Sequence, residues 1–337
     1  MDKILESNIG ASGEALSEYS IPFDEKYEIK INYFHTATGN HLFNEPEYFN
    51  IHTSSLNDIY AQLVRQSDAK VFLTIAIYEI DTNIFSSPKH GTYGGLSLNE
   101  KIRFAKVEKF MSLLSDFLKL KGGRSLRIRC APASHDLAWF SIMFNVLKRQ
   151  GFTLDAHEIN FDLVVDKRSF IDRIDYGNVK RIRKSIKNEF ICEKTDHERF
   201  DEVYEVIKDS RARLGLSVSM SFLQLEKMMT LFPEKIHLFS VYRDSTKSSM
   251  VASAVCMTLT NSIMYVFYWG DTADVSTYSP IALLASKIYE FCQENEIIVL
   301  DVGISTIGGE PNYGLMQFKH NLGFSESLKA DYSLKLK

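Results

Sequence analysis

The sequence predicts an α/β protein with mixed (α+β) sheets, organised as two domains with similar element order. The chain has 337 residues, which is more than one domain usually holds and makes two domains the natural expectation. Strand-like apolar runs alternate with amphipathic stretches at helical spacing. The order strand, helix, strand, helix, strand then occurs once in each half. Such an order places helices on the faces of sheets.

Composition excludes several classes of protein. Hydrophobic residues make up 45% of the chain and charged residues 24%, so a disordered or low-complexity chain is excluded. The net charge of −4 gives no overall attraction to polyanions, so we expect no DNA partner, and charge disfavours tRNA without excluding it. The apolar runs are strand-sized, and the N-terminus lacks a signal-like stretch, so we expect a cytoplasmic protein without a membrane span.

Metal chemistry is not supported by the sequence. The 4 cysteines lie far apart, without the close pairs that zinc or dithiol chemistry needs, and we expect them to be reduced and mostly buried. The 9 histidines show no metal-binding spacing such as His-Glu-x-x-His. We therefore expect no metal site.

The first half opens with residues 1–26, a polar stretch without periodicity that we interpret as an extension. Leu56, Ile59, Tyr60 and Leu63 recur at helical spacing and predict a helix over 54–66. The other elements expected here are strands over 27–34 and 71–80, a helix over 97–121, a strand over 126–130, a helix over 136–150 and a strand over 152–165.

The second half opens with a basic stretch over 180–187. Lys180, Arg183, Lys184 and Lys187 share one helix face, which could hold a nucleotide diphosphate or tRNA phosphates, or could be a solvated surface helix. Ser279 as N-cap and Pro280 in the first turn predict the start of a later helix. The other elements expected are helices over 198–213 and 222–231, a meander over 236–242, 250–259 and 262–269, a strand over 297–302, a helix over 313–321 and a strand over 324–336.

Short sequence words repeat between the halves. An aromatic residue and glycine end a strand at Tyr93-Gly94 and again at Trp269-Gly270, with the two glycines 176 residues apart. A Gly-Phe pair follows a lysine-containing helix at Phe152 and again at Phe324, 172 residues apart. We therefore expect one domain over 27–168 and a second over 169–337, with the last strand able to pair back to the first domain.

This order resembles the GNAT acyltransferase fold, and two copies in one chain resemble the FemABX-type tandem acyltransferases, which lengthen peptidoglycan cross-bridges. The resemblance is carried by Ser87-Pro88 leading to 91–95, Trp269-Gly270, Ser279-Pro280 with 281–284, Leu300-Asp301-Val302-Gly303 and Phe318-Lys319 with 320–324. It implies transfer of an N-acyl or aminoacyl group to the amine of a cell-envelope sugar or peptide precursor, by direct attack without a covalent enzyme intermediate.

The resemblance implies either acyl-CoA or aminoacyl-tRNA as the donor. Ordinary GNAT enzymes bind phosphate through a Gln/Arg-x-x-Gly-x-Gly/Ala loop, but here Asp271 and Asp274 stand in that loop and would repel a phosphate. FemABX-type proteins also depart from this loop and use aminoacyl-tRNA. Two alternatives stay open, namely an acyl-CoA-dependent N-acetyltransferase acting on a small amine or sugar, and a non-catalytic module that binds a glycan or nucleotide-sugar.

The resemblance also implies candidate site residues. Lys319 matches the family lysine that steadies the donor and the developing negative charge, although a solvated lysine paired with a carboxylate is the alternative. Asp301 at a strand end and Tyr278 are the other catalytic candidates, with a cap or ion pair and a core position as their alternatives. We expect donor contacts from Trp269, Gly270, Ser279, Ile281, Ala282 and Phe318, and acceptor contacts from Tyr93, Gly94, Arg181 and Lys184.

Overall fold

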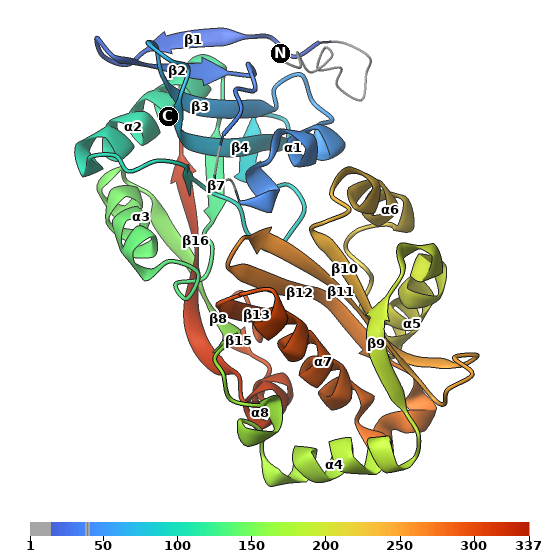
Figure 1. Cartoon of the computed structure of the whole chain (residues 1–337). Helices are drawn as coiled ribbons and strands as arrows, with labels where there is room; N and C mark the ends of the chain where they lie inside the picture. Colours follow the sequence, from blue (N-terminus) through green and yellow to red (C-terminus); the bar gives the residue numbers. More distant parts are fainter. Residues whose placement is uncertain (1–14, 38, 40, 337) are drawn as a thin grey trace. The chain divides into compact units, whose positions relative to one another are not determined.

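The computed structural model describes residues 15–37, 39 and 41–336 and divides into two compact units (Figure 1). Unit 1 runs to His157 and also includes the residues from Lys329 onward, and unit 2 is Glu158–Leu328. Each unit has its own apolar core. This division lies earlier in the chain than the expected boundary between 168 and 169, which stays a prediction. No helix in the described ranges is long and apolar enough to cross a membrane.

Unit 1 is a sheet with the strand order β1-β2-β3-β4-β5-β7-β16. Neighbours from β1 to β5 are antiparallel, β5 is parallel to β7, and the last part of β16 pairs antiparallel with β7. The strands are β1 (Tyr19–Pro22), β2 (Tyr27–Ile31), β3 (Ile59–Arg65), β4 (Val71–Asp81), β5 (Ile84–Ser87), β6 (Ser97–Leu98), β7 (Ser125–Arg129) and β16 (Ser325–Lys335). The helices are η1 (Leu42–Asn44), α1 (Pro46–His52), α2 (Phe104–Leu120) and α3 (Leu137–Arg149).

Two expectations for this half are wrong. The stretch predicted as a helix over 54–66 contains strand β3, whose residues are buried from Ile59 to Val64. Because β3 lies between β2 and β4, hydrogen bonds to both neighbours outweigh the helical spacing of its side chains. Helix α2 begins only at Phe104, since 97–98 pair with β4 as β6. The N-terminal extension over 1–26 stays a prediction. Its described part contains β1, and its residues 1–14 lie outside the described part of the chain.

Unit 2 is a sheet with the strand order β8-β13-β12-β11-β10-β9. The predicted meander is confirmed by antiparallel pairing of β10 with β11 and of β11 with β12. The strands are β8 (Thr153–Val164), β9 (Ile191–Thr195), β10 (Ile236–Tyr242), β11 (Met250–Thr260), β12 (Ile263–Asp271), β13 (Val299–Ile304), β14 (Thr306–Ile307) and β15 (Glu310–Pro311). The helices are η2 (Phe170–Asp172), α4 (Tyr176–Lys187), η3 (His197–Arg199), α5 (Phe200–Arg213), α6 (Phe222–Leu231), η4 (Ala273–Tyr278), α7 (Pro280–Glu294) and α8 (Tyr313–Asn321).

The predicted repeat of elements is present in the fold. In unit 1, α2 connects the parallel strands β5 and β7, and in unit 2, α7 connects the parallel strands β12 and β13. The antiparallel neighbour of the second strand then comes from the other half of the sequence. In unit 1 it is the end of β16, which pairs with β7, and in unit 2 it is the end of β8, which pairs with β13.

Candidate active site

Strands β12 and β13 of unit 2 separate after a short parallel pairing. They pair over three residue pairs, which end at Tyr265 and Asp301. Strand β12 continues to Asp271, whereas β13 turns at Gly303, which has a φ of 77°. A positive φ of this kind favours glycine. The separation of two neighbouring parallel strands is the feature at which the GNAT resemblance expects a donor.

Lys319 lies beside this separation. It is 2% exposed, and its ammonium Nζ donates hydrogen bonds to the backbone carbonyls of Gly303 at 2.8 Å and Ile304 at 2.9 Å. The Phe161 ring centroid lies 5.4 Å from Nζ. Burial lowers the pKa of Lys319 to about 7, and the charge of Asp301 acts in the opposite direction. Lys319 is therefore not a solvated surface lysine. With a pKa of about 7, the Lys319 side chain changes its charge near neutral pH.

Asp301 is fully buried and fixes the turn that follows it. Its Oδ1 accepts hydrogen bonds from Gly303 N at 2.7 Å and from Asn160 Nδ2 at 2.9 Å. Its partner in the ladder on β8 is Asp162, which accepts a hydrogen bond from Ser327 Oγ at 2.5 Å. The structure thus brings Lys319 and Asp301 together, with Asp301 supporting the backbone that holds the lysine.

Two of the expected donor residues are also in contact with each other. The rings of Trp269 and Phe318 meet edge to face with centroids 6.2 Å apart, and Trp269 also contacts Phe324 at 6.5 Å. The glycine at position 270 is required by packing, because a Cβ there would lie 2.6 Å from Ser210 Cβ of α5. Gly270 therefore allows α5 to approach β12 closely, and a donor contact by its backbone stays a prediction.

The start of α7 agrees with the prediction in its position but not in the hydrogen bonding of its N-cap side chain. Ser279 stands at the N-cap position and Pro280 in the first turn, as predicted, but Ser279 has a φ of 52° and its side chain makes no cap hydrogen bond. The side chains of Ile281 and Ala282 belong to the apolar core. The loop aspartates are ion-paired, Asp271 with Arg213 at 3.1 Å and Asp274 with Arg243. Donor contacts by Ser279, Ile281 and Ala282 stay predictions, and they would be made by backbone groups of these residues.

Tyr278 lies against helix α4. Its ring centroid is 5.0 Å from that of Phe190 and 4.4 Å from Lys184 Nζ, and its carbonyl accepts a hydrogen bond from Ser185 Oγ at 2.9 Å. Arg181 and Lys184 are exposed on α4. These contacts are made by the ring and the carbonyl of Tyr278 and join it to the basic helix. Proton donation by its hydroxyl stays a prediction.

Helix α4 carries five exposed cations and no acidic residue, namely Lys180, Arg181, Arg183, Lys184 and Lys187. None of them forms an ion pair with a carboxylate within residues 15–37, 39 and 41–336, whereas many cations elsewhere in this part of the chain do. This face could therefore attract an anionic group.

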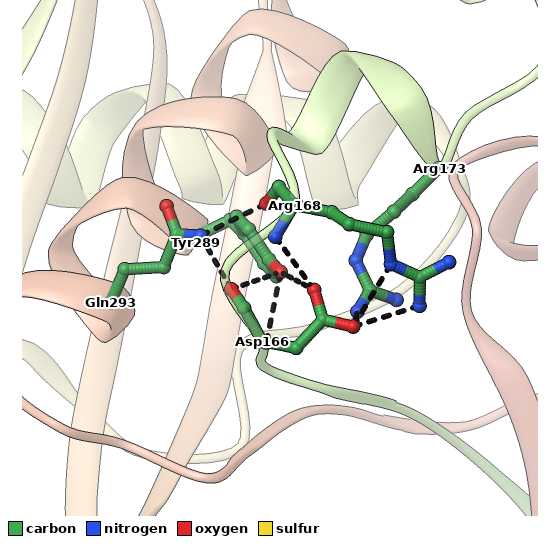
Figure 2. Close-up of polar contacts among 5 residues, drawn as sticks. All are labelled: Asp166, Arg168, Arg173, Tyr289 and Gln293. Carbon is green, nitrogen blue, oxygen red and sulfur yellow. Dashed lines mark hydrogen bonds and ion pairs between the residues drawn. The ribbon is translucent and has the colours of Figure 1, made fainter.

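The segment that leads into α4 is fixed to α7 by Asp166 (Figure 2). The Asp166 carboxylate binds the guanidinium groups of Arg168 and Arg173, and these hydrogen bonds hold its pKa well below the usual range. Its backbone binds the Tyr289 hydroxyl at 3.1 Å and the Gln293 side-chain amide at 2.6 Å. Asp166 thus ties the segment before α4 to α7.

The two expected acceptor residues of unit 1 lie in a packed aromatic region. Tyr93 is 1% exposed, and its hydroxyl is 2.8 Å from His41 Nε2, with the rings of Phe43 and His135 nearby. Gly94 N donates to the carbonyl of Arg129 at 2.9 Å. These contacts lie within unit 1, and acceptor binding by Tyr93 and Gly94 stays a prediction.

Sequence reasoning missed several residues around Lys319. Asn160 and Glu158 come from β8, where polar residues at 158, 160 and 162 alternate with apolar ones. That alternation is visible in the sequence, but such a pattern usually indicates a strand with one solvated face. In this structure the polar residues at 158, 160 and 162 are buried instead. Within the described residues, no group of three or more His, Cys, Asp or Glu side chains is arranged to hold a metal ion.

Solved structures with the same architecture are known. FemX superposes with a TM-score of 0.64 over 89% of this chain and 93% of its own, at 14% sequence identity. The chain has the FemX fold. L-PGS from Bacillus licheniformis gives a TM-score of 0.56 over 87% of each chain at 11% identity. A conserved protein of unknown function from Bacteroides thetaiotaomicron gives 0.57 over 90% of this chain and 94% of its own at 8% identity.

The predicted fold class is thus confirmed as two GNAT-like domains in tandem, and the resemblance to FemABX-type proteins is confirmed for the fold. The sequence itself matches no model of a protein family and no curated protein. At such low identity, likeness to FemX concerns the architecture, so activity has to be argued from the site.

Proposed function

We propose that the protein transfers an acyl or aminoacyl group to the amine of a cell-envelope sugar or peptide precursor. The observation that supports this most is the buried ammonium of Lys319 beside the separated strands β12 and β13 in a FemX fold. A fixed cation in a site that excludes water stabilises negative charge far better than one in solvent.

In the proposed reaction, the neutral acceptor amine attacks the donor carbonyl directly. A C–N bond forms, the C–O bond of an ester or the C–S bond of a thioester breaks, and the amine proton leaves with the oxygen or sulfur. Lys319 stabilises the developing oxyanion, and Asp301 holds the turn at Gly303 that supplies one of the lysine's carbonyl partners. Positioning of the two reactants supplies the rest of the acceleration.

The choice of donor depends on where its phosphates bind. Asp271 and Asp274 occupy the place of the ordinary phosphate loop and are paired with arginines of their own unit. The cations of α4, including Arg181 and Lys184, are exposed and without such partners among the described residues. This contrast favours an aminoacyl-tRNA donor with its phosphates near α4. Acyl-CoA is the second donor to be tested.

A panel of ligands tests the proposal. Thermal unfolding is measured with acetyl-CoA, coenzyme A, a UDP-sugar-peptide and charged tRNA, because a ligand at about 100 times its dissociation constant stabilises by about 2.7 kcal/mol. The stabilising donor and acceptor are then combined in a transfer assay. Turnover supports the proposal, whereas stabilisation by a glycan or nucleotide-sugar without turnover with any donor supports the non-catalytic binding module instead.

A further inference from the structure

A tight hairpin links the two parts of the Lys319 site. In β14 and β15, Thr306 pairs with Pro311 and Ile307 with Glu310, so Gly308 and Gly309 form a two-residue turn. Their φ values are 60° and 85°, and a type I′ turn needs positive φ at both positions, which glycine accepts without strain. The hairpin follows the carbonyl groups that bind Lys319 and precedes the helix α8 that carries it.

Glu158 of β8 binds this hairpin. Glu158 is 5% exposed. Its carboxylate accepts hydrogen bonds from Gly308 N at 2.8 Å, from Gly309 N at 3.4 Å and from the Thr306 hydroxyl. Thr306 Oγ1 itself accepts a hydrogen bond from Ile159 N at 2.9 Å, so its own proton is directed to Glu158. Successive backbone N–H groups of this kind form a concave site for a carboxylate.

Strand β8 fixes the first end of the hairpin, and the second end is hydrogen-bonded to the first. Ser305 N donates to the carbonyl of Ile159 at 2.8 Å, and Asn312 N donates to the carbonyl of Ser305 at 2.9 Å. The Asn312 side chain then caps α8 by accepting from Leu315 N at 3.0 Å. The start of α8 and the carbonyl groups of Gly303 and Ile304 are therefore held by one hydrogen-bonded network that Glu158 completes.

We infer that Glu158 is a positioning residue for Lys319, an inference that rests on the proposed function. By fixing the hairpin, Glu158 sets the places of the Gly303 and Ile304 carbonyls relative to α8 and so directs the ammonium. Without a carboxylate at 158, one hydroxyl and two N–H groups lose their acceptor in a buried place, which costs free energy and shifts the hairpin. Water then reaches Lys319.

The test compares Glu158→Gln with Glu310→Gln, which changes an exposed glutamate in the same hairpin. Glutamine keeps the size of Glu158 but replaces one acceptor oxygen with an NH₂ group. This NH₂ group then faces the Thr306 hydroxyl or a glycine N–H, each of which donates a hydrogen bond to Glu158 in the wild type. We expect kcat to fall by about 10-fold to 10²-fold with KM little changed, because misplacement of a catalytic group by about 1 Å costs this much. Glu310→Gln should match the wild type.

The second readout is independent of activity. In protein with ¹³C-labelled lysine, NMR follows the titration of Lys319, assigned with Lys319→Met. Its midpoint in the wild type should lie near the pKa of about 7 that burial produces. In Glu158→Gln it should rise by about one pH unit or more, which is a tenfold change in proton affinity. Thr306→Val should shift it in the same direction, whereas Thr306→Ser should not.

An unchanged Lys319 midpoint in Glu158→Gln and in Thr306→Val would overturn the inference. This outcome differs from a failure of the proposed function, which would appear as full activity of Lys319→Met. In that case the titration still decides whether Glu158 orients the lysine.

Discussion

Helices α3 of unit 1 and α8 of unit 2 end in the same way but carry different residues at one equivalent position. Phe152 N donates to the carbonyl of Leu147 at 3.0 Å, and Phe324 N donates to the carbonyl of Lys319 at 3.1 Å. The preceding glycines, Gly151 and Gly323, have φ values of 83° and 80°. This is the 6→1 hydrogen bond of a helix C-terminal motif, so Leu147 is the structural equivalent of Lys319.

The difference shows where the chemistry lies. Leu147 is fully buried in the core of unit 1, and Lys148, the lysine of the helix before the Gly-Phe pair of the first half, is exposed. A buried lysine needs acceptors for its N–H groups, and unit 2 supplies the carbonyls of Gly303 and Ile304. The repeated frame therefore holds a filled apolar core in unit 1 and a polar site in unit 2.

The largest expected effect comes from removing this difference. Lys319→Met keeps the volume but removes the charge, and we expect kcat and kcat/KM to fall together by about 10² to 10³, or about 2.7 to 4 kcal/mol. The matched control is Leu147→Met at the equivalent position, which should leave activity unchanged. Steady-state kinetics with both variants, and circular dichroism to show that they fold, make the comparison. Equal activity of the two variants would mean that the site is not a catalytic one.

The sequence predicted the fold well because periodicity and turn residues are local signals. The bounds of α6, β10 and α8 agree with the predicted ranges. It failed at β3, where buried pairing to two neighbours hides the strand period. Lys319 and Asp301 could be proposed from the resemblance. Asn160, which binds Asp301, and Glu158, which binds the hairpin after β13, lie far away in sequence on β8, and only strand pairing brings them near.

The repeated glycines allow a second comparison between the units. A Cβ on Gly94 would lie 2.6 Å from Pro88 N and 2.8 Å from Ser87 C, which are backbone atoms, whereas a Cβ on Gly270 would meet Ser210 Cβ at 2.6 Å. Gly94→Ala and Gly270→Ala should each lower the free energy of unfolding by about 1 to 3 kcal/mol, measured by urea denaturation. Adding Ser210→Gly should recover part of the loss in Gly270→Ala. If it recovers none, the close approach of α5 is not what requires Gly270.

The pH dependence of activity tests whether the charge of Lys319 is what distinguishes unit 2. Its pKa of about 7 lies below the ordinary lysine value, so the cation is present below about pH 7 and is lost above it. We expect the contribution of Lys319 to kcat to fall about tenfold for each pH unit above this value. Deprotonation of the acceptor amine raises the rate over the same range, so the wild-type rate is divided by that of Lys319→Met at each pH. A ratio that does not fall above pH 7 would show that the cation of Lys319 is not the active form.

Stability should change in the opposite direction over the same range. The unfolded chain keeps the lysine proton up to its ordinary value, while the folded protein has released it above pH 7. The unfolded state therefore binds more protons between the two values, and stability should rise with pH across that window. Lys319→Met should lack this rise, whereas Leu147→Met should keep it, as denaturant midpoints at several pH values would show.

The smallest expected effect concerns the surface lysines of the two units. Lys184 of α4 lies 4.4 Å from the centroid of the Tyr278 ring, and a contact of this kind at an exposed site contributes at most about 1 kcal/mol. Lys184→Gln should therefore barely change the unfolding free energy. If α4 binds donor phosphates, Lys184→Gln should raise KM for the donor with kcat unchanged. The slope of log KM against the logarithm of salt concentration should also decrease by about one, because one fewer counterion is released. Lys148→Gln, at the exposed lysine of α3, should change neither quantity. Because both substitutions remove one exposed charge, equal donor KM values in the two variants would mean that α4 is a solvated surface helix.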